Sequence, residues 1–152
     1  MQSCSNTGAE TPPTDQPDER KLWWTPNAGT MTLAADIAVS IVALLHAYFL
    51  VLEMFLWNSD FGRRTFGTTK EFAAASKSLA ANQGLYNGFL AAGLIWGLLS
   101  GAAGKPIEIF FLACVVIAGL YGAATANRKI LFVQALPGAV ALAIMYLSIR
   151  AS

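Results

Sequence analysis

The chain has 152 residues, of which 55% are hydrophobic and only 12% are charged, and its formal net charge at pH 7 is +1. Soluble domains carry about twice that share of charged residues, so the composition excludes an ordinary water-soluble globule. It also excludes a chain that is disordered throughout, because disorder requires low hydrophobicity and high net charge. Without a basic excess, the chain lacks the electrostatic footprint of a nucleic-acid-binding protein.

Residues 1–30 differ in composition from the rest of the chain. They hold four acidic residues, four of the six prolines and many small polar residues, which is typical of disorder. No apolar stretch follows a basic start, so we do not interpret this segment as a signal peptide. We predict a disordered polar and acidic tail. Met31 stands directly before the first apolar run. A later start codon is therefore an alternative, and the tail would then not belong to the native protein.

From residue 31 onward, long apolar stretches are delimited by charges, and Glu53 is the only formal charge between Asp36 and Asp60. Each stretch offers the roughly 20 mostly apolar residues that a helix needs to cross the hydrocarbon core. The apolar runs are continuous rather than alternating, which favours helices over a β-barrel. We therefore predict an all-α polytopic membrane protein, in which residues 31–152 form a four-helix transmembrane bundle. The spans are expected at about 34–57, 82–100, 107–125 and 130–149.

The connections between the spans set the expected orientation. Thr68 or Thr69, in the long first connection, is placed to cap a helix that leads into the second span. The first and third connections together hold six basic residues, against four on the opposite side. The six are Arg63, Arg64, Lys70, Lys77, Arg128 and Lys129. The positive-inside bias places these connections in the cytoplasm and both termini outside, and in a bacterium it predicts a multi-pass protein of the cytoplasmic (inner) membrane.

Small residues recur at helical spacing in the second and fourth spans. They are Gly84, Gly88 and Ala92, then Gly93, Gly97 and Gly101, and finally Ala135, Ala139 and Ala143. Such rows let helix backbones approach closely. The two glycine rows of the second span lie about a quarter turn apart, which predicts a central position for this helix. The same rows offer surfaces for a homo-oligomer.

Several strings in the apolar region are specific enough to compare with known proteins. The most specific runs from Ala81 to Phe89 and reads ANQGLYNGF. The others are His46-Ala47-Tyr48-Phe49 with Glu53 and Trp57, then Gly119-Leu120-Tyr121-Gly122-Ala123 and Gln134-Ala135-Leu136-Pro137. Over about residues 31–152, the chain resembles the family of small integral membrane proteins catalogued as domain of unknown function 1304. The resemblance implies a multi-pass membrane protein and no assigned activity.

Polar side chains inside the predicted spans are the candidate functional residues, because a charge or amide in hydrocarbon is costly unless it faces a partner or a cavity. Glu53 lies about one turn above the cytoplasmic end of the first span. At about 1.5 Å per residue, six further polar residues fall at a similar depth. These candidate ligand-binding residues are Asn82, Gln83, Tyr86, Asn87, Tyr121 and Gln134. For the amides and tyrosines, a network that only holds the helices together is the alternative.

His46 lies two helical turns before Glu53 on the same helix face, nearer the middle of the membrane. If the protein is an enzyme, which the sequence leaves open, His46 and Glu53 are its candidate catalytic residues. One histidine and one glutamate supply too few ligands for a metal, and Cys4 and Cys114 lack the spacing of a metal site or a disulfide. We therefore expect no metal site. No cofactor motif occurs, so we expect no cofactor either.

Three classes of function fit these observations. The first is a small carrier or ligand-binding membrane protein in which Glu53 exchanges a proton or holds a cation near the cytoplasmic face. The second is a membrane-embedded, isomerase-like enzyme on a lipophilic substrate, with His46 and Glu53 as an acid-base pair. The third is a structural or accessory subunit whose polar layer only packs. The lipid bilayer and a small or lipophilic ligand are the expected partners, and the lack of a nucleophile motif favours the first class over the second.

Overall fold

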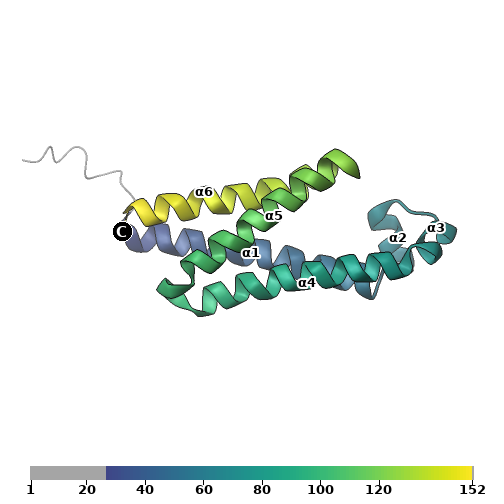
Figure 1. Ribbon diagram of the computed structural model, residues 1–152, viewed down its shortest axis with the longest axis horizontal. Coiled ribbons are helices and arrows are strands. Elements are labelled where there is room, and N and C mark those ends of the chain that lie inside the picture. Colours follow the sequence, from purple (N-terminus) through teal and green to yellow (C-terminus); the bar gives the residue numbers. More distant parts are fainter. Residues whose placement is uncertain (1–26, 152) are drawn as a thin grey trace, which may run out of the picture.

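The computed structural model describes residues 27–151 (Figure 1). Every regular element in this part of the chain is helical, which confirms the all-α fold class. The α-helices are α1 (Ala28–Met54), α2 (Asp60–Phe66), α3 (Lys70–Ala75), α4 (Lys77–Leu99), α5 (Lys105–Thr125) and α6 (Leu136–Ala151). Two short irregular turns complete the set, the 3-10 turn η2 (Gly101–Gly104) and the π-helical turn η3 (Leu131–Ala135).

The first helix begins earlier than the sequence predicts. The side chain of Asn27 accepts a hydrogen bond from the backbone N–H of Thr30 at 2.7 Å, so α1 starts at Ala28 rather than near residue 34. Residues 28–30 of the predicted tail therefore belong to a helix. The prediction of disorder for residues 1–26 lies outside the described residues.

Within residues 27–151, three helical segments are long and apolar enough to cross a membrane: Ala28–Met54, Gly101–Thr125 and Leu131–Ala151. They correspond to three of the four predicted spans. The fourth long helix, α4, covers the predicted second span but is not among the three. Its first half is the more polar, since it carries Lys77, Ser78, Asn82, Gln83 and Asn87.

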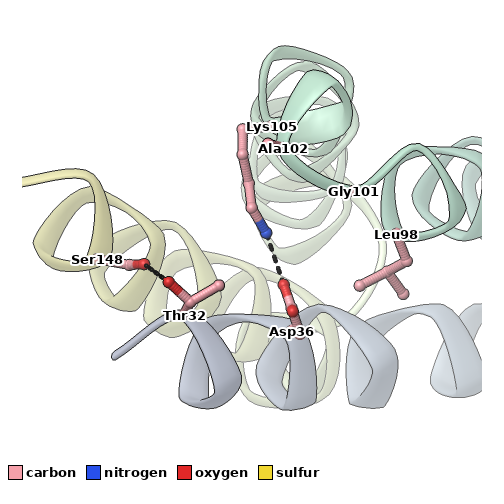
Figure 2. Close-up of a pocket in the computed structure, with 7 residues that line it drawn as sticks. All are labelled: Thr32, Asp36, Leu98, Gly101, Ala102, Lys105 and Ser148. Atoms are coloured by element: carbon pink, nitrogen blue, oxygen red, sulfur yellow. Dashed lines mark hydrogen bonds and ion pairs between the residues drawn. The ribbon is translucent and has the colours of Figure 1, made fainter. Parts of the chain in front are cut away.

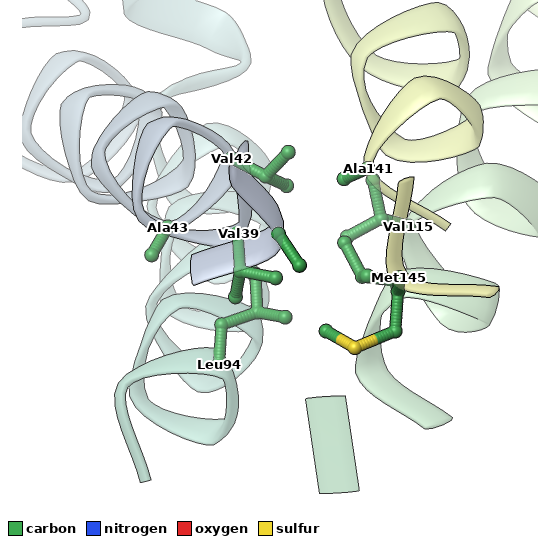
Figure 3. Close-up of a cluster of buried hydrophobic side chains, with 9 residues drawn as sticks. Val39, Val42, Ala43, Leu94, Val115, Ala141 and Met145 are labelled. Atoms are coloured by element: carbon green, nitrogen blue, oxygen red, sulfur yellow. The ribbon is translucent and has the colours of Figure 1, made fainter. Parts of the chain in front are cut away.

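The long helices pack around one apolar core. Helix α1 packs against α4 and α6, and α5 packs against α4, α6 and η3. Side chains of α1, such as Val39 and Val42, face Leu94 of α4 and Met145 of α6 (Figure 3). Outside this core, large apolar side chains point away from the protein: Leu44 is 69% exposed, Ile117 67% and Leu99 84%. An apolar exterior of this kind is compatible with membrane association.

The glycines of α4 allow close packing against two different helices. A Cβ on Gly84 would lie 3.0 Å from the backbone N of Met54 in α1, whereas one on Gly93 would lie 2.2 Å from the ring of Phe111 in α5. A Cβ on Gly97 would meet the Glu108 side chain of α5 at 2.5 Å. The two glycine rows thus let α4 approach α1 at one end and α5 at the other.

The first connection folds into two short helices at one end of the bundle (Figure 1). The hydroxyl of Thr69 accepts a hydrogen bond from the N–H of Phe72 at 3.2 Å, which confirms the predicted cap. The helix does not continue into the second span, however, because α3 ends at Ala75 and α4 begins at Lys77. The indole of Trp57 donates to the hydroxyl of Ser76 at 3.1 Å across this break.

Candidate functional site

Glu53 and Asn87 meet where the end of α1 crosses the first half of α4. The side-chain amide of Asn87 donates to Oε2 of Glu53 at 2.6 Å. Asn87 is buried and Glu53 is half-buried. Gly84 lies one turn before Asn87, and a Cβ there would lie only 3.1 Å from the Cβ of Glu53. The glycine therefore brings the two backbones close enough for this carboxylate and amide to bond.

The other predicted residues of the polar layer do not converge on Glu53. Asn82, Gln83, Tyr86 and Tyr121 are exposed. Gln134 lies in η3 and donates to the carbonyl of Val115 at 3.4 Å. The reason is the direction of the side chains, because residues at the same depth can lie on different helix faces. The buried residues of α4 are Ala80, Gly84, Asn87, Ala91, Gly93, Leu94 and Gly97.

His46 is almost fully buried in α1, at 1% exposure. Its Nδ1 lies 2.8 Å from the carbonyl oxygen of Val42, one turn earlier on the same helix. Its Nε2 is buried and has no hydrogen-bond partner among the described residues. Seven residues separate His46 from Glu53, which corresponds to about 10 Å along the helix axis. The two side chains therefore occupy separate environments.

A second polar cluster, which is not among the candidate residues predicted from the sequence, lies at the opposite end of the bundle. Lys105 at the start of α5 places its Nζ 2.6 Å from Oδ1 of Asp36 in α1. The same Nζ lies 3.4 Å from Oε2 of Glu108, one turn further along α5. Glu108 is fully buried, and its Oε1 has no hydrogen-bond partner among the described residues.

This second cluster borders a cavity of about 250 Å³ (Figure 2). The cavity is lined by Thr32, Asp36, Leu98, Gly101, Ala102, Lys105 and Ser148. The hydroxyls of Thr32 and Ser148 lie 3.3 Å apart and join α1 to α6. The Lys105 side chain extends from the start of α5 toward Asp36 (Figure 2). Four helix ends thus surround a small space with both polar and apolar walls.

In the sequence, the charges of this cluster mark the ends of the predicted spans. A usable signal was nevertheless present. In an up-and-down bundle, the start of the first helix and the start of the third lie at the same end. Lys105 and Glu108 are also three residues apart, which places them on one helix face. Asp36, Lys105 and Glu108 could therefore have been grouped from their positions alone.

The described residues contain no group of three or more His, Cys, Asp or Glu placed to hold a metal ion. Their chemistry is that of single carboxylates with an amide or an ammonium partner. Within residues 27–151, the Glu53 pair offers acceptor oxygens with no positive charge in bonding contact, whereas the Asp36 cluster contains its own cation.

The fold and these sites define an all-helical protein with membrane-length apolar helices and a polar group near each end of α1. The model of a family described as "Protein of unknown function (DUF1304)" matches residues 40–146, so the chain belongs to this family and the resemblance is confirmed. The chain is similar to the uncharacterized protein YpaA of Lactococcus lactis subsp. lactis strain IL1403. The two are 35% identical over 106 residues, or 68% of this chain and 89% of that protein. No solved structure matches the chain.

Proposed function

We propose that this chain is a four-span membrane protein of the carrier or ligand-binding class, in which Glu53 exchanges a proton or holds a small cation. In this proposal α4 crosses the membrane together with α1, α5 and α6. The Glu53 end faces the cytoplasm, because the basic residues of the first and third connections favour that side. Both termini then lie outside.

The packing of α4 supports four spans rather than three. Helix α4 is 23 residues long, enough to cross the roughly 30 Å hydrocarbon core. It packs along α1 and α5, both of membrane-spanning length and composition, and therefore shares their depth. Its buried amide, Asn87, bonds to Glu53 instead of facing lipid. Its remaining polar residues lie in the first turns, toward the membrane surface.

The single observation that carries the proposed function is the bond between Glu53 and Asn87. A carboxylate in an apolar helix is costly unless it has a partner, and an uncharged amide leaves its negative charge uncompensated. A carboxylate has about four acceptor positions, of which the Asn87 amide occupies one. The half-buried Glu53 can therefore still take up a proton or a cation, which a purely structural amide could not do.

The structure gives less support to an acid-base enzyme. Its two candidate residues bond to other groups, since Glu53 accepts from Asn87 and Nδ1 of His46 lies 2.8 Å from the carbonyl oxygen of Val42. The remaining class, a structural subunit, differs from the proposal in one testable respect. A packing role needs only the hydrogen bond of residue 53, whereas a carrier or binding role needs its charge.

The test replaces Glu53 with Gln, which keeps the shape and a carbonyl acceptor for Asn87. Glu71→Gln is the matched control, because Glu71 is exposed on α3. The full-length proteins are purified, reconstituted in lipid vesicles and assayed for flux of protons and of Na⁺. We expect flux in the wild type and in Glu71→Gln, and its loss in a folded Glu53→Gln. Equal flux in Glu53→Gln, or no flux of either ion in the wild type, would overturn the carrier proposal.

A further inference from the structure

The Asp36 cluster has more negative than positive charges. Asp36 and Glu108 are two carboxylates, and Lys105 is the one cation that contacts them within residues 27–151. Lys105 uses Oδ1 of Asp36, on a side chain that is 42% exposed. The cluster therefore retains one formal negative charge beside a cavity, at a site separate from Glu53.

Glu108 adds a second and independent sign that the cluster is incomplete. Its side chain is fully buried, yet within residues 27–151 Oε1 has no hydrogen-bond partner and Oε2 has only a long contact of 3.4 Å to Lys105. A buried acceptor without a partner costs roughly 1–3 kcal/mol, and more when it is charged. The chain accommodates Glu108 at this place because Gly97 has no side chain that would collide with it.

The walls of the cavity restrict the ligand that would complete this cluster. An added anion would increase the net negative charge, whereas a cation would neutralise it. The hydroxyls of Thr32 and Ser148 and the Asp36 carboxylate can accept hydrogen bonds, and an ammonium group has three N–H donors. Leu98 and Ala102 supply an apolar wall, and the volume of about 250 Å³ admits only a small molecule.

We propose that the cavity between α1, α4, α5 and α6 binds a small primary alkylammonium compound, whose ammonium contacts Asp36 and whose alkyl part lies against Leu98 and Ala102. Lys105 shows that the cluster accepts an ammonium at this place. When the ligand binds Asp36, the flexible Lys105 side chain turns fully toward Glu108 and shortens the 3.4 Å contact. Binding then leaves each carboxylate with one cation. This site goes beyond the proposed role of Glu53 and does not depend on it.

The test uses n-butylammonium chloride as the probe and the full-length protein in detergent micelles. Binding is followed by saturation-transfer NMR, with sodium chloride used to hold the ionic strength constant. The uncharged 1-butanol controls for partition into micelles, and tetramethylammonium controls for charge without N–H donors. We expect saturable binding of n-butylammonium, and affinities for both control compounds that are weaker by about tenfold or more.

Two variants locate the binding. Asp36→Asn should weaken n-butylammonium binding by about tenfold, because it removes the charge that the ammonium contacts. The matched control is Asp60→Asn, on the exposed helix α2, which should bind as the wild type does. Thr32→Val keeps the Asp36–Lys105 ion pair, and we expect it to fold and to bind the probe several-fold more weakly.

Three results would overturn the proposal. The first is a wild type that does not bind n-butylammonium saturably. The second is equal binding of tetramethylammonium, which would mean that the cavity does not recognise N–H donors. The third is unchanged affinity in a folded Asp36→Asn protein. If Asp36→Asn does not fold, unchanged affinity in Thr32→Val has the same meaning.

Discussion

The two ends of the bundle hold a carboxylate in two different ways. At one end, Glu53 is bonded to an uncharged amide, Asn87, and is half-buried. At the other end, the fully buried Glu108 and the partly exposed Asp36 share the ammonium of Lys105. About 26 Å of α1 separates Asp36 from Glu53, a length close to the roughly 30 Å thickness of a hydrocarbon core.

The two ends differ in whether charge supports the fold or is available for function. An amide partner supplies a hydrogen bond but no compensating charge, so the fold at the Glu53 end does not depend on the charge of residue 53. An ammonium partner compensates charge, and removing it leaves a buried carboxylate unpaired, which is strongly destabilising. Removal of the Lys105 ammonium should therefore be costly, whereas removal of the Glu53 charge should cost little.

The largest expected effect comes from Lys105→Met. This change leaves the buried Glu108 without a cation and should lower the free energy of unfolding by about 3 kcal/mol, measured by denaturant titration in micelles. The double variant Lys105→Met/Glu108→Gln removes the unpaired charge and should recover most of that loss. A single variant as stable as the wild type would show that Lys105 does not compensate Glu108.

A smaller loss is expected from Gly104→Ala, also at the Asp36 end. A Cβ on Gly104 would lie 1.8 Å from the carbonyl oxygen of Gly97, so the α4–α5 turn must shift, at a cost of about 2 kcal/mol. Gly101→Ala is the comparison, because Gly101 has a φ of +56° but open space around it. Its backbone strain should cost only about 1 kcal/mol. Melting temperatures that rank the two variants in the reverse order would contradict the packing of this turn.

The smallest effect on stability is expected from Glu53→Gln. The Gln side chain can still accept the hydrogen bond of Asn87, so the free energy of unfolding should change by less than about 1 kcal/mol. Asn87→Leu should cost more, since it leaves the half-buried carboxylate without its amide partner. Denaturant titration of both variants provides the test. A larger loss in Glu53→Gln than in Lys105→Met would reverse the comparison between the two ends.

The sequence predicts the apolar helices well because hydropathy and charge spacing determine them directly. It also places Glu53 and Asn87 in the same candidate site, because both are polar residues at similar depth. Depth alone did not separate Asn87 from Asn82, Gln83 and Tyr86, since that separation depends on which face of α4 is buried. The buried face follows from Gly84, whose missing side chain lets α4 approach α1. The glycine rows predict packing surfaces, but the amides can be oriented only when the row that faces α1 is known.

The sequence pattern does not predict the Asp36 cluster, for a different reason. Charged residues near the ends of apolar runs are ordinarily expected to lie in water, but Glu108 is buried. Glu108 is fully buried in the first turn of α5, where Gly97 of α4 gives its side chain room. Hydropathy along the chain contains no information about such a tertiary contact. The start of α1 is a different case, because the local side-chain cap from Asn27 extends the helix beyond its apolar run.

The most direct test of this account is whether the two ends of α4 lie on opposite sides of a membrane. Single cysteines replace Ala74 in α3 and Ala103 in η2, both exposed, in a protein whose Cys4 and Cys114 have been replaced. A membrane-impermeant maleimide is then applied to intact bacterial cells and to inverted membrane vesicles. The account predicts labelling of residue 103 only in intact cells and of residue 74 only in inverted vesicles. Labelling of both positions from the same side would show that α4 does not cross the membrane, and would contradict the four-span arrangement on which the proposed function rests.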